Sequence, residues 1–234
     1  MISGLQKMTL LDFPGKVACT VFLYGCNLRC PFCHNSELFG GKPEPVMSED
    51  AFLAYLKSRQ GLLDGVCVSG GEPTLQPDLP ELLAQIKALG FAVKLDTNGS
   101  RPEVLKKLVA QGLVDYVAMD VKNGPEAYGT TIGLRGYDLT LVEESLRFLI
   151  DGGVDYELRT TVVAQLHADA SVLQMGRWLE ALVPGKKAKK LFLQFFVDRE
   201  SVLGAGLNAH DRETMEKFVE ILTPFVAEVA IRGD

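Results

Sequence analysis

The sequence predicts an α/β protein whose parallel sheet curls towards a barrel. Seven strand-like runs alternate with six helix-like segments along the chain, and such alternation is typical of a parallel sheet. Right-handed crossovers curl a sheet of this kind. At 234 residues, of which 47% are hydrophobic, the chain suits one domain with a substantial core. We therefore predict a single domain over 1–234, folded as a partial (β/α)6 barrel of the TIM type with parallel strands.

Each predicted element rests on a local pattern. Strands are short apolar runs, and helices are segments with apolar residues three and four apart. Helix starts carry capping residues, such as Ser48 and the capping boxes at 78–81 and 100–103. In chain order, the prediction is strand 17–24, cysteine loop 25–35, connector 39–45, helix 48–59, strand 64–69, helix 78–90, strand 91–95, helix 100–112, strand 116–121, loop 123–136, helix 141–150, strand 156–163, helix 169–182, strand 191–197, helix 209–222 and strand 226–231, with the strand–helix repeats occupying 48–234.

Composition narrows the class of protein. Thirty acidic residues against 24 basic ones give a net charge of −6, which argues against nucleic acid as the principal partner. No apolar run approaches the roughly 20 residues of a membrane-spanning helix, so no membrane association is expected. Five cysteines without a secretory signal favour a reducing, cytoplasmic location. The basic run 186–190 is interpreted as a solvated loop, with docking of an acidic partner as the alternative.

Three cysteines follow the first predicted strand. Cys26, Cys30 and Cys33 have the spacing C-x3-C-x2-C within one short loop. Three thiolates can hold three irons of a 4Fe–4S cluster, which normally takes four cysteine ligands. The fourth iron would then be open to a small molecule. Cys19 and Cys67 lie in apolar runs and are predicted to be small core residues.

Other chemistries fit the same cysteines less well. Cys30 to His34 matches the C-x-x-C-H pattern of covalent haem attachment, but that attachment is normally made outside the cytoplasm and leaves Cys26 without a role. A thioredoxin-like pair likewise needs no third cysteine. A zinc site wants a fourth ligand, and His34 directly after Cys33 is poorly placed to supply it. Zinc is therefore the second interpretation and the cluster is the first.

Polar residues stand at the C-terminal ends of successive predicted strands, where a parallel barrel carries its working residues. The turn 69–73 contains Gly70 and Gly71, which let a ligand approach the backbone closely. Glu72 in the same turn suits an ammonium group rather than a phosphate, which would want basic residues. The next strand is followed by the run 96–99, which reads Asp-Thr-Asn-Gly and is open to interpretation as a turn alone.

Charged residues continue the series in the second half of the chain. Asp120 and Lys122 are two apart on one strand and face the same side, so an ion pair between them is one interpretation. Arg159 lies inside an apolar strand and should have an acidic partner or a bound carboxylate nearby. His167 and His210 are expected to face solvent rather than to act in catalysis.

Taken together, these motifs resemble the radical S-adenosylmethionine superfamily. The resemblance is carried by the three cysteines, with Phe32 before the third, and by the turn 70–73, Gly-Gly-Glu-Pro. Further motifs are similar to those of the glycyl-radical-enzyme activases, above all those that act on anaerobic ribonucleoside-triphosphate reductase, with those of pyruvate formate-lyase as relatives. These motifs are Asp12-Phe13-Pro14-Gly15, Tyr24-Gly25-Cys26, Cys33-His34-Asn35, Asp96-Thr97-Asn98-Gly99 and Asp120-Val121-Lys122. The resemblance covers nearly the whole chain and is strongest over 4–122.

The resemblance implies a reaction. One 4Fe–4S cluster on Cys26, Cys30 and Cys33 would bind S-adenosylmethionine at its open iron, through the amino and carboxylate groups of that cofactor. An electron from the reduced cluster would cleave the sulfonium bond and yield a 5′-deoxyadenosyl radical, which would take a hydrogen atom from a glycine of a partner enzyme. The implied partners are a glycyl radical enzyme, above all an anaerobic ribonucleotide reductase, and an electron donor of the flavodoxin or ferredoxin type.

The resemblance also implies roles for particular residues. The residues that would bind the cofactor are Phe32, Gly70, Gly71, Glu72, Asp96, Thr97, Lys122 and Arg159, and a monovalent cation would lie at Asp96, Thr97 and Asp120. One departure is Val197, which stands where the pyruvate formate-lyase type carries a histidine. Two alternatives remain open at this point: a radical enzyme of the same superfamily that acts on a small molecule, and an iron–sulfur carrier without enzymatic activity.

Overall fold

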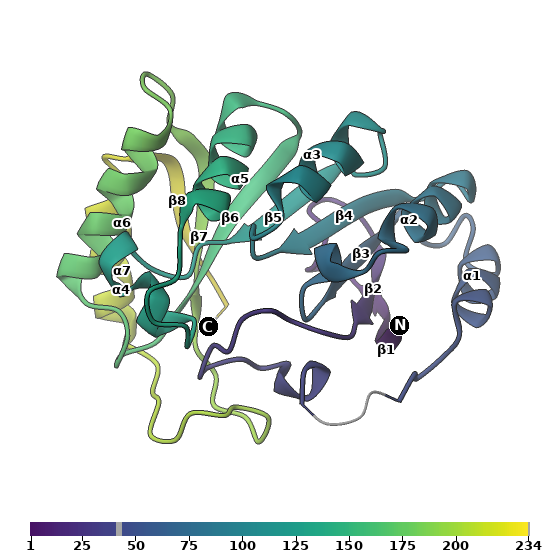
Figure 1. Ribbon diagram of the computed structural model, residues 1–234, viewed down its shortest axis with the longest axis horizontal. Helices are drawn as coiled ribbons and strands as arrows, with labels where there is room; N and C mark the ends of the chain where they lie inside the picture. The colour runs from purple at the N-terminus through teal and green to yellow at the C-terminus, as the bar shows by residue number, and fades with distance from the viewer. Residues whose placement is uncertain (41–43, 234) are drawn as a thin grey trace. The chain divides into compact units, whose positions relative to one another are not determined.

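The computed structural model describes residues 1–40 and 44–233, so part of the predicted connector 39–45 lies outside the described residues. Eight strands are hydrogen-bonded in chain order, β1 to β8, into one open sheet (Figure 1). The strands are β1 (Ile2–Thr9), β2 (Ala18–Leu23), β3 (Gly65–Gly70), β4 (Ala92–Thr97), β5 (Tyr116–Asp120), β6 (Asp155–Val162), β7 (Ala188–Phe195) and β8 (Val226–Arg232). The helices are α1 (Glu49–Lys57), α2 (Leu79–Ala88), α3 (Pro102–Ala110), α4 (Pro125–Thr131), α5 (Thr140–Asp151), α6 (Asp169–Leu182) and α7 (Arg212–Leu222). None of the described helices has the length and hydropathy needed to cross a membrane.

Contacts group the chain into two compact units made of interleaved segments. The first unit comprises 1–27, 35–97 and 101–118, and the second comprises 28–34, 98–100 and 119–234. Strand β5 is shared, because its first three residues belong to the first unit and its last two to the second.

The first unit contains the start of the sheet. Strand β1 pairs antiparallel with β2, whereas β2, β3 and β4 pair in parallel. Five of the six residues of β2 are buried, which explains why this strand reads as a continuous apolar run. Helix α2 buries Leu79, Leu82, Leu83 and Ile86 and packs against β4 and α1. The carboxyl ends of the parallel strands are thereby fixed at one edge.

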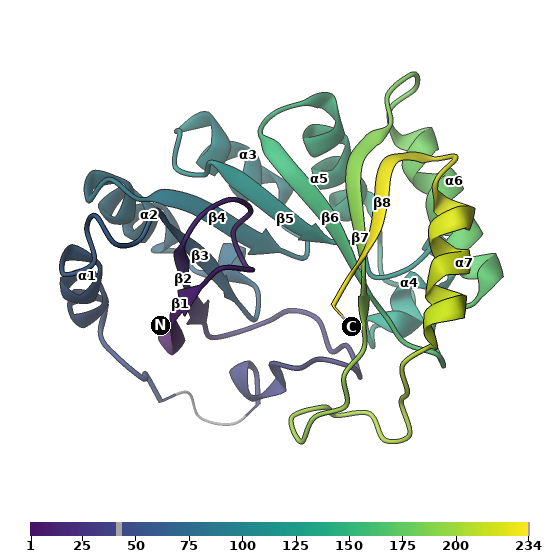
Figure 2. The same ribbon diagram turned by 180° about the vertical axis from the view of Figure 1, so that it is seen from behind.

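The second unit contains the end of the sheet. Strands β6, β7 and β8 pair in parallel, and α7 packs against both β8 and α6 (Figure 2). The basic run 186–190 leads into β7, and its lysines are held in local contacts. Lys186 pairs with Asp151 at 2.5 Å, and Lys189 pairs with Asp155 at 3.6 Å. Because β7 begins at Ala188, the interpretation of 186–190 as a loop is wrong for its last three residues. Docking of an acidic partner stays a prediction.

The predicted α/β class and a mostly parallel sheet are confirmed, although β1 pairs antiparallel with β2. Three details are corrected. Strand β1 was not predicted. Helix α4 lies inside the stretch 123–136 that the sequence analysis interprets as a loop. The capping boxes at 78–81 and 100–103 are wrong, because the N-cap residues are Asp78 and Arg101 and neither makes a side-chain capping hydrogen bond. Both of those helices instead begin with proline in the first turn, where its missing N–H costs nothing.

Candidate functional site

None of the three cysteines of the loop after β2 forms a disulfide. Cys30 is buried, with 7% of its surface exposed, and Cys26 and Cys33 are half-buried. Cys26 belongs to the first unit, and the other two belong to the second. Within residues 1–40 and 44–233, no three side chains of His, Cys, Asp or Glu are placed to hold a single metal ion. The assignment of these cysteines to an iron–sulfur cluster stays a prediction, and three unbridged thiols in one loop are a donor set that fits it.

The turn after β3 is joined to the residues directly before Cys26. Glu72 N–H donates to the Gly25 carbonyl oxygen at 2.7 Å, and Gly71 N–H donates to the Leu23 carbonyl oxygen at 3.0 Å. A Cβ atom built on Gly71 would lie 2.1 Å from the Gly25 carbonyl oxygen and 3.1 Å from the Cys26 nitrogen. Glycine is therefore required here by the close approach of two backbone segments.

Glu72 is a buried carboxylate held by hydrogen bonds. Its side chain is 1% exposed. Its Oε1 atom accepts hydrogen bonds from Thr74 N–H at 3.1 Å, from the Thr74 hydroxyl, and from the Thr97 hydroxyl at 2.8 Å. These donors offset the cost of taking a carboxylate out of water. The structure thus brings the predicted residues Glu72 and Thr97 into direct contact within the first unit.

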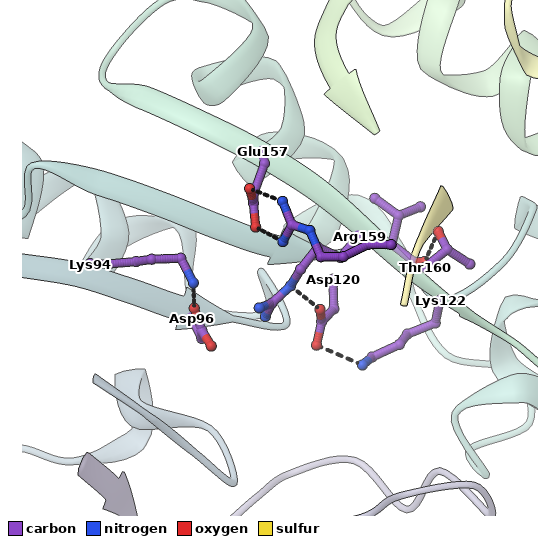
Figure 3. Close-up of polar contacts among 9 residues, drawn as sticks. Lys94, Asp96, Asp120, Lys122, Glu157, Arg159 and Thr160 are labelled. Atoms are coloured by element: carbon purple, nitrogen blue, oxygen red, sulfur yellow. Dashed lines mark hydrogen bonds and ion pairs between the residues drawn. The ribbon is translucent and has the colours of Figure 1, made fainter. Parts of the chain in front are cut away.

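Asp96, at the end of β4, has a partner that the sequence analysis did not identify. Lys94 Nζ lies 2.7 Å from Asp96 Oδ1 (Figure 3), and the Lys94 side chain is only 1% exposed. The two residues are two apart on one strand and therefore face the same side of the sheet. This spacing of two residues is the feature of the sequence from which the ion pair could have been predicted. The contact is an ion pair in which the lysine is almost completely buried.

Asp120, Lys122 and Arg159 form a second charged cluster, in the second unit. Asp120 Oδ2 lies 2.9 Å from Lys122 Nζ, and Asp120 Oδ1 lies 3.1 Å from Arg159 Nε (Figure 3). Burial would raise the pKa of Asp120, but the two cations outweigh it and lower the pKa to about 2. The carboxylate in turn raises the pKa of Lys122 against the effect of burial. The predicted pair Asp120–Lys122 and the predicted acidic partner of Arg159 are both confirmed.

Glu157 and Arg232 form a further ion pair that the sequence analysis missed. Both carboxylate oxygens of Glu157 accept hydrogen bonds from Arg232, at 2.7 and 2.8 Å. The Glu157 side chain is fully buried, and the Arg232 guanidinium lies 3.8 Å from the ring centroid of Phe192. Glu157 stands two residues before Arg159 on β6, so both charges face one side of the sheet.

The expectation that His167 and His210 face solvent is wrong. His167 is buried, with 1% of its surface exposed. Its Nδ1 atom accepts a hydrogen bond from Val163 N–H at 3.0 Å, and its Nε2 atom lies 2.9 Å from the Lys122 carbonyl oxygen. His210 is half-buried, with Nε2 at 2.9 Å from the His167 carbonyl oxygen. The ring of His167 therefore supports the backbone that carries Lys122.

The predicted site residues divide between the two units. Gly70, Gly71, Glu72, Asp96, Thr97 and Cys26 lie in the first, and Phe32, Cys30, Cys33, Asp120, Lys122 and Arg159 lie in the second. Phe32 is buried, with 4% of its surface exposed. The predicted monovalent-cation site draws Asp96 and Thr97 from one unit and Asp120 from the other. It stays a prediction, as do the roles of the other residues in cofactor binding.

Comparison with known proteins gives a family and two informative relatives. The model of the radical SAM superfamily matches residues 20–167. The Methanocaldococcus jannaschii protein named "Putative glycyl-radical enzyme activating enzyme MJ1227" is 36% identical over 187 residues, which cover 76% of this chain and 74% of that protein. The pyruvate formate-lyase-activating enzyme of Streptococcus mutans is 27% identical over 195 residues, which cover 78% of this chain and 73% of the enzyme.

The fold is also found in solved structures. The crystal structure of Streptococcus suis SuiB bound to S-adenosylmethionine superposes with a TM-score of 0.67 at 14% identity. The superposition covers 91% of this chain and 49% of SuiB. At this level of identity the likeness concerns the fold alone.

Proposed function

The chain belongs to the radical SAM superfamily, and from this premise we propose that it activates an anaerobic ribonucleotide reductase by forming a glycyl radical on that enzyme. The relation to glycyl-radical-enzyme activating proteins supports the activase class. The motifs that resemble the ribonucleotide reductase group, together with Val197 where the pyruvate formate-lyase type has histidine, support the finer choice of partner.

The observation that carries the proposal is the contact between the glycine turn and the cysteine loop inside the first unit. Glu72 N–H is bonded to the carbonyl oxygen of Gly25, and the backbone of Gly71 approaches the nitrogen of Cys26. A ligand held at Cys26 would lie beside the Gly71–Glu72 turn. This is the arrangement expected where a group bound at a cluster also presents an ammonium to a buried carboxylate.

The residues of this chain bind and orient the cofactors. The cluster and S-adenosylmethionine, when bound, supply one-electron cleavage of a sulfonium and a carbon radical able to remove a hydrogen atom from glycine. Glu72 carries the buried negative charge for the amino group of the cofactor. Lys122 and Arg159 supply two positive charges beside Asp120, and their N–H groups would bind the carboxylate of the cofactor.

The remaining cysteines favour one cluster rather than two. Burial raises the pKa of Cys19 and of Cys67 to about 12. The thiolate is the form that binds metal, and these thiols stay protonated in the core. The loop cysteines are therefore the three that are suited to ligate iron.

The decisive experiment combines the anaerobically reduced, cluster-loaded protein with S-adenosylmethionine and a candidate glycyl radical enzyme. Electron paramagnetic resonance should detect a glycyl radical on an anaerobic ribonucleotide reductase, and chromatography should detect 5′-deoxyadenosine. The test variant is Glu72→Gln, which keeps the size of the side chain and removes its charge. We expect this variant to retain the cluster and to lose most of its affinity for S-adenosylmethionine.

The outcomes separate the alternatives. A glycyl radical on pyruvate formate-lyase instead would contradict the proposed partner and leave the activase class intact. Formation of 5′-deoxyadenosine with no glycyl radical on any candidate would favour a small-molecule substrate. If a loaded, reduced protein forms no 5′-deoxyadenosine at all, the enzymatic interpretation is wrong and an iron–sulfur carrier is favoured.

A further inference from the structure

The segment of residues 196–204, which follows β7, packs against the part of the cysteine loop that lies in the second unit. Gly204 N–H donates to the carbonyl oxygen of Pro31 at 2.8 Å. A Cβ atom on Gly204 would lie 3.0 Å from Pro31 Cβ and 3.1 Å from its carbonyl oxygen. Because Gly204 is not among the glycines with positive φ, glycine is favoured here by close approach and not by backbone conformation.

A second contact is made on His34. Its carbonyl oxygen accepts a hydrogen bond from Ser201 Oγ at 2.7 Å. Its ring stacks on Phe196, with 5.7 Å between ring centroids and 24° between ring planes. The buried Nε2 atom of His34 has no hydrogen-bond partner among the described residues. The ring is held by stacking on Phe196 and by a hydrogen bond with the backbone of Val197, and Ser201 holds the His34 backbone.

These contacts lie on both sides of one cysteine. Pro31 precedes Cys33 by two residues, and His34 follows it directly. Both carbonyl oxygens are held by a segment that is more than 160 residues away in the chain, since the Ser201–His34 bond joins residues 167 apart. The backbone that carries Cys33 is therefore fixed at two points by residues outside the loop.

We propose that residues 196–204 act as a clamp that positions Cys33 as a cluster ligand and slows the loss of iron. The inference rests on the proposed function, because it takes the cluster as given. Metal ligands depend on neighbouring groups that hold them in place, and removing such a group weakens metal retention. Ser201 and Gly204 are positioning residues in this account. They also give a role to the segment after β7, which contains Val197.

The test measures iron loss from the cluster-loaded full-length protein under anaerobic conditions. An excess of the ferrous chelator bathophenanthroline disulfonate is added, and the absorbance of its iron complex is followed. Ser201→Ala should release iron about three- to tenfold faster than wild type, the factor that corresponds to one ordinary hydrogen bond. Gly204→Ala should act in the same direction, because its Cβ forces the segment away from Pro31.

The matched control is Ser58→Ala. Ser58 Oγ also donates to a backbone carbonyl oxygen at 2.7 Å, that of Tyr55, at the exposed end of α1 in the first unit. Iron loss from this variant should equal that of wild type. If Gly204→Ala fails to fold, Ser201→Ala decides the matter alone.

Three results would overturn the clamp. Loaded variants that lose iron at the wild-type rate would overturn the clamp alone and leave the proposed function standing, as would a control variant accelerated by the same factor. A wild-type protein that holds no cluster after anaerobic reconstitution would overturn both proposals.

Discussion

Replacing Asp120 by asparagine should destabilise the second unit through its charges. The carboxylate binds Lys122 at 2.9 Å and Arg159 at 3.1 Å, and each of these cationic side chains is only 15% exposed. Asparagine has nearly the same shape and no charge, so the variant leaves two poorly solvated cations close together. Breaking a buried ion pair by removing one partner is strongly destabilising, because the remaining charge is not compensated.

The magnitude follows from the pKa. Lowering the pKa of Asp120 from 3.8 to about 2 corresponds to about 2 kcal/mol of preference for the charged form. The Asp120 side chain is 31% exposed, so solvent screening reduces this value, whereas the repulsion left between the two cations adds to it. We expect Asp120→Asn to lower the free energy of unfolding by about 2–3 kcal/mol at neutral pH.

The pH dependence gives a second signature. Because the pKa of the folded state is depressed, the contribution is fully present above the unfolded-state pKa near 4 and is lost as the pH falls towards 2. Wild type and variant should therefore differ at pH 7 and converge towards pH 2.

Urea unfolding followed by circular dichroism measures both effects. Asp151→Asn is the matched control, since Asp151 pairs with Lys186 at the surface, with side chains 69% and 51% exposed. It should change stability by less than about 1 kcal/mol. Equal stability of Asp120→Asn and wild type at pH 7 would refute the reasoning.

Three further predictions use other parts of the molecule. Cys30→Ala should abolish the visible absorption of the reconstituted cluster, whereas Cys67→Ala should retain it; an intact spectrum in Cys30→Ala would remove that residue from the ligand set. Gly71→Ala places a methyl group 2.1 Å from a backbone oxygen, so it should lower the free energy of unfolding in urea by about 1–3 kcal/mol. It should also weaken S-adenosylmethionine binding in equilibrium dialysis, and unchanged binding would contradict the close approach. Lys94→Met should lower the free energy of unfolding in urea by about 3 kcal/mol, and the double variant with Asp96→Asn should regain part of that loss. If the losses of the two single variants simply add, the two charges do not act as a pair.

The fold class could be predicted from the sequence because strand-like and helix-like patterns alternate clearly along the chain. Strand β2 is almost wholly buried, and α5 ends at Gly152 with φ of +104°, a left-handed conformation that glycine adopts readily. The ion pair of Asp120 with Lys122 was also predictable. Two opposite charges spaced two apart on one strand face the same side whatever the rest of the fold does.

Some elements could not be predicted because their local signal is weak. Strand β1 shows no clean alternation and contains Gly4, and it forms by pairing with β2. Helix α4 has seven residues with Gly129 inside it, so its composition is that of a loop. A Cβ atom at Gly129 would lie 2.8 Å from the Leu134 carbonyl oxygen, so the turn that follows the helix favours glycine at that point.

The distant partners of two buried polar side chains were missed for a different reason. His167 is buried because it binds the backbone at Lys122, 45 residues earlier. Arg232 meets Glu157 across 75 residues of sequence. The residues that are near these positions in the sequence do not indicate either contact, since both contacts depend on how the strands are ordered in the sheet.

The most direct test of the central claim compares the electron paramagnetic resonance spectrum of the reduced, reconstituted protein before and after addition of S-adenosylmethionine. If three cysteines hold a cluster with one iron open to that cofactor, the wild-type spectrum should change on addition. The spectrum of Glu72→Gln should change only at much higher concentrations. A cluster spectrum that stays the same at saturating S-adenosylmethionine would contradict the account.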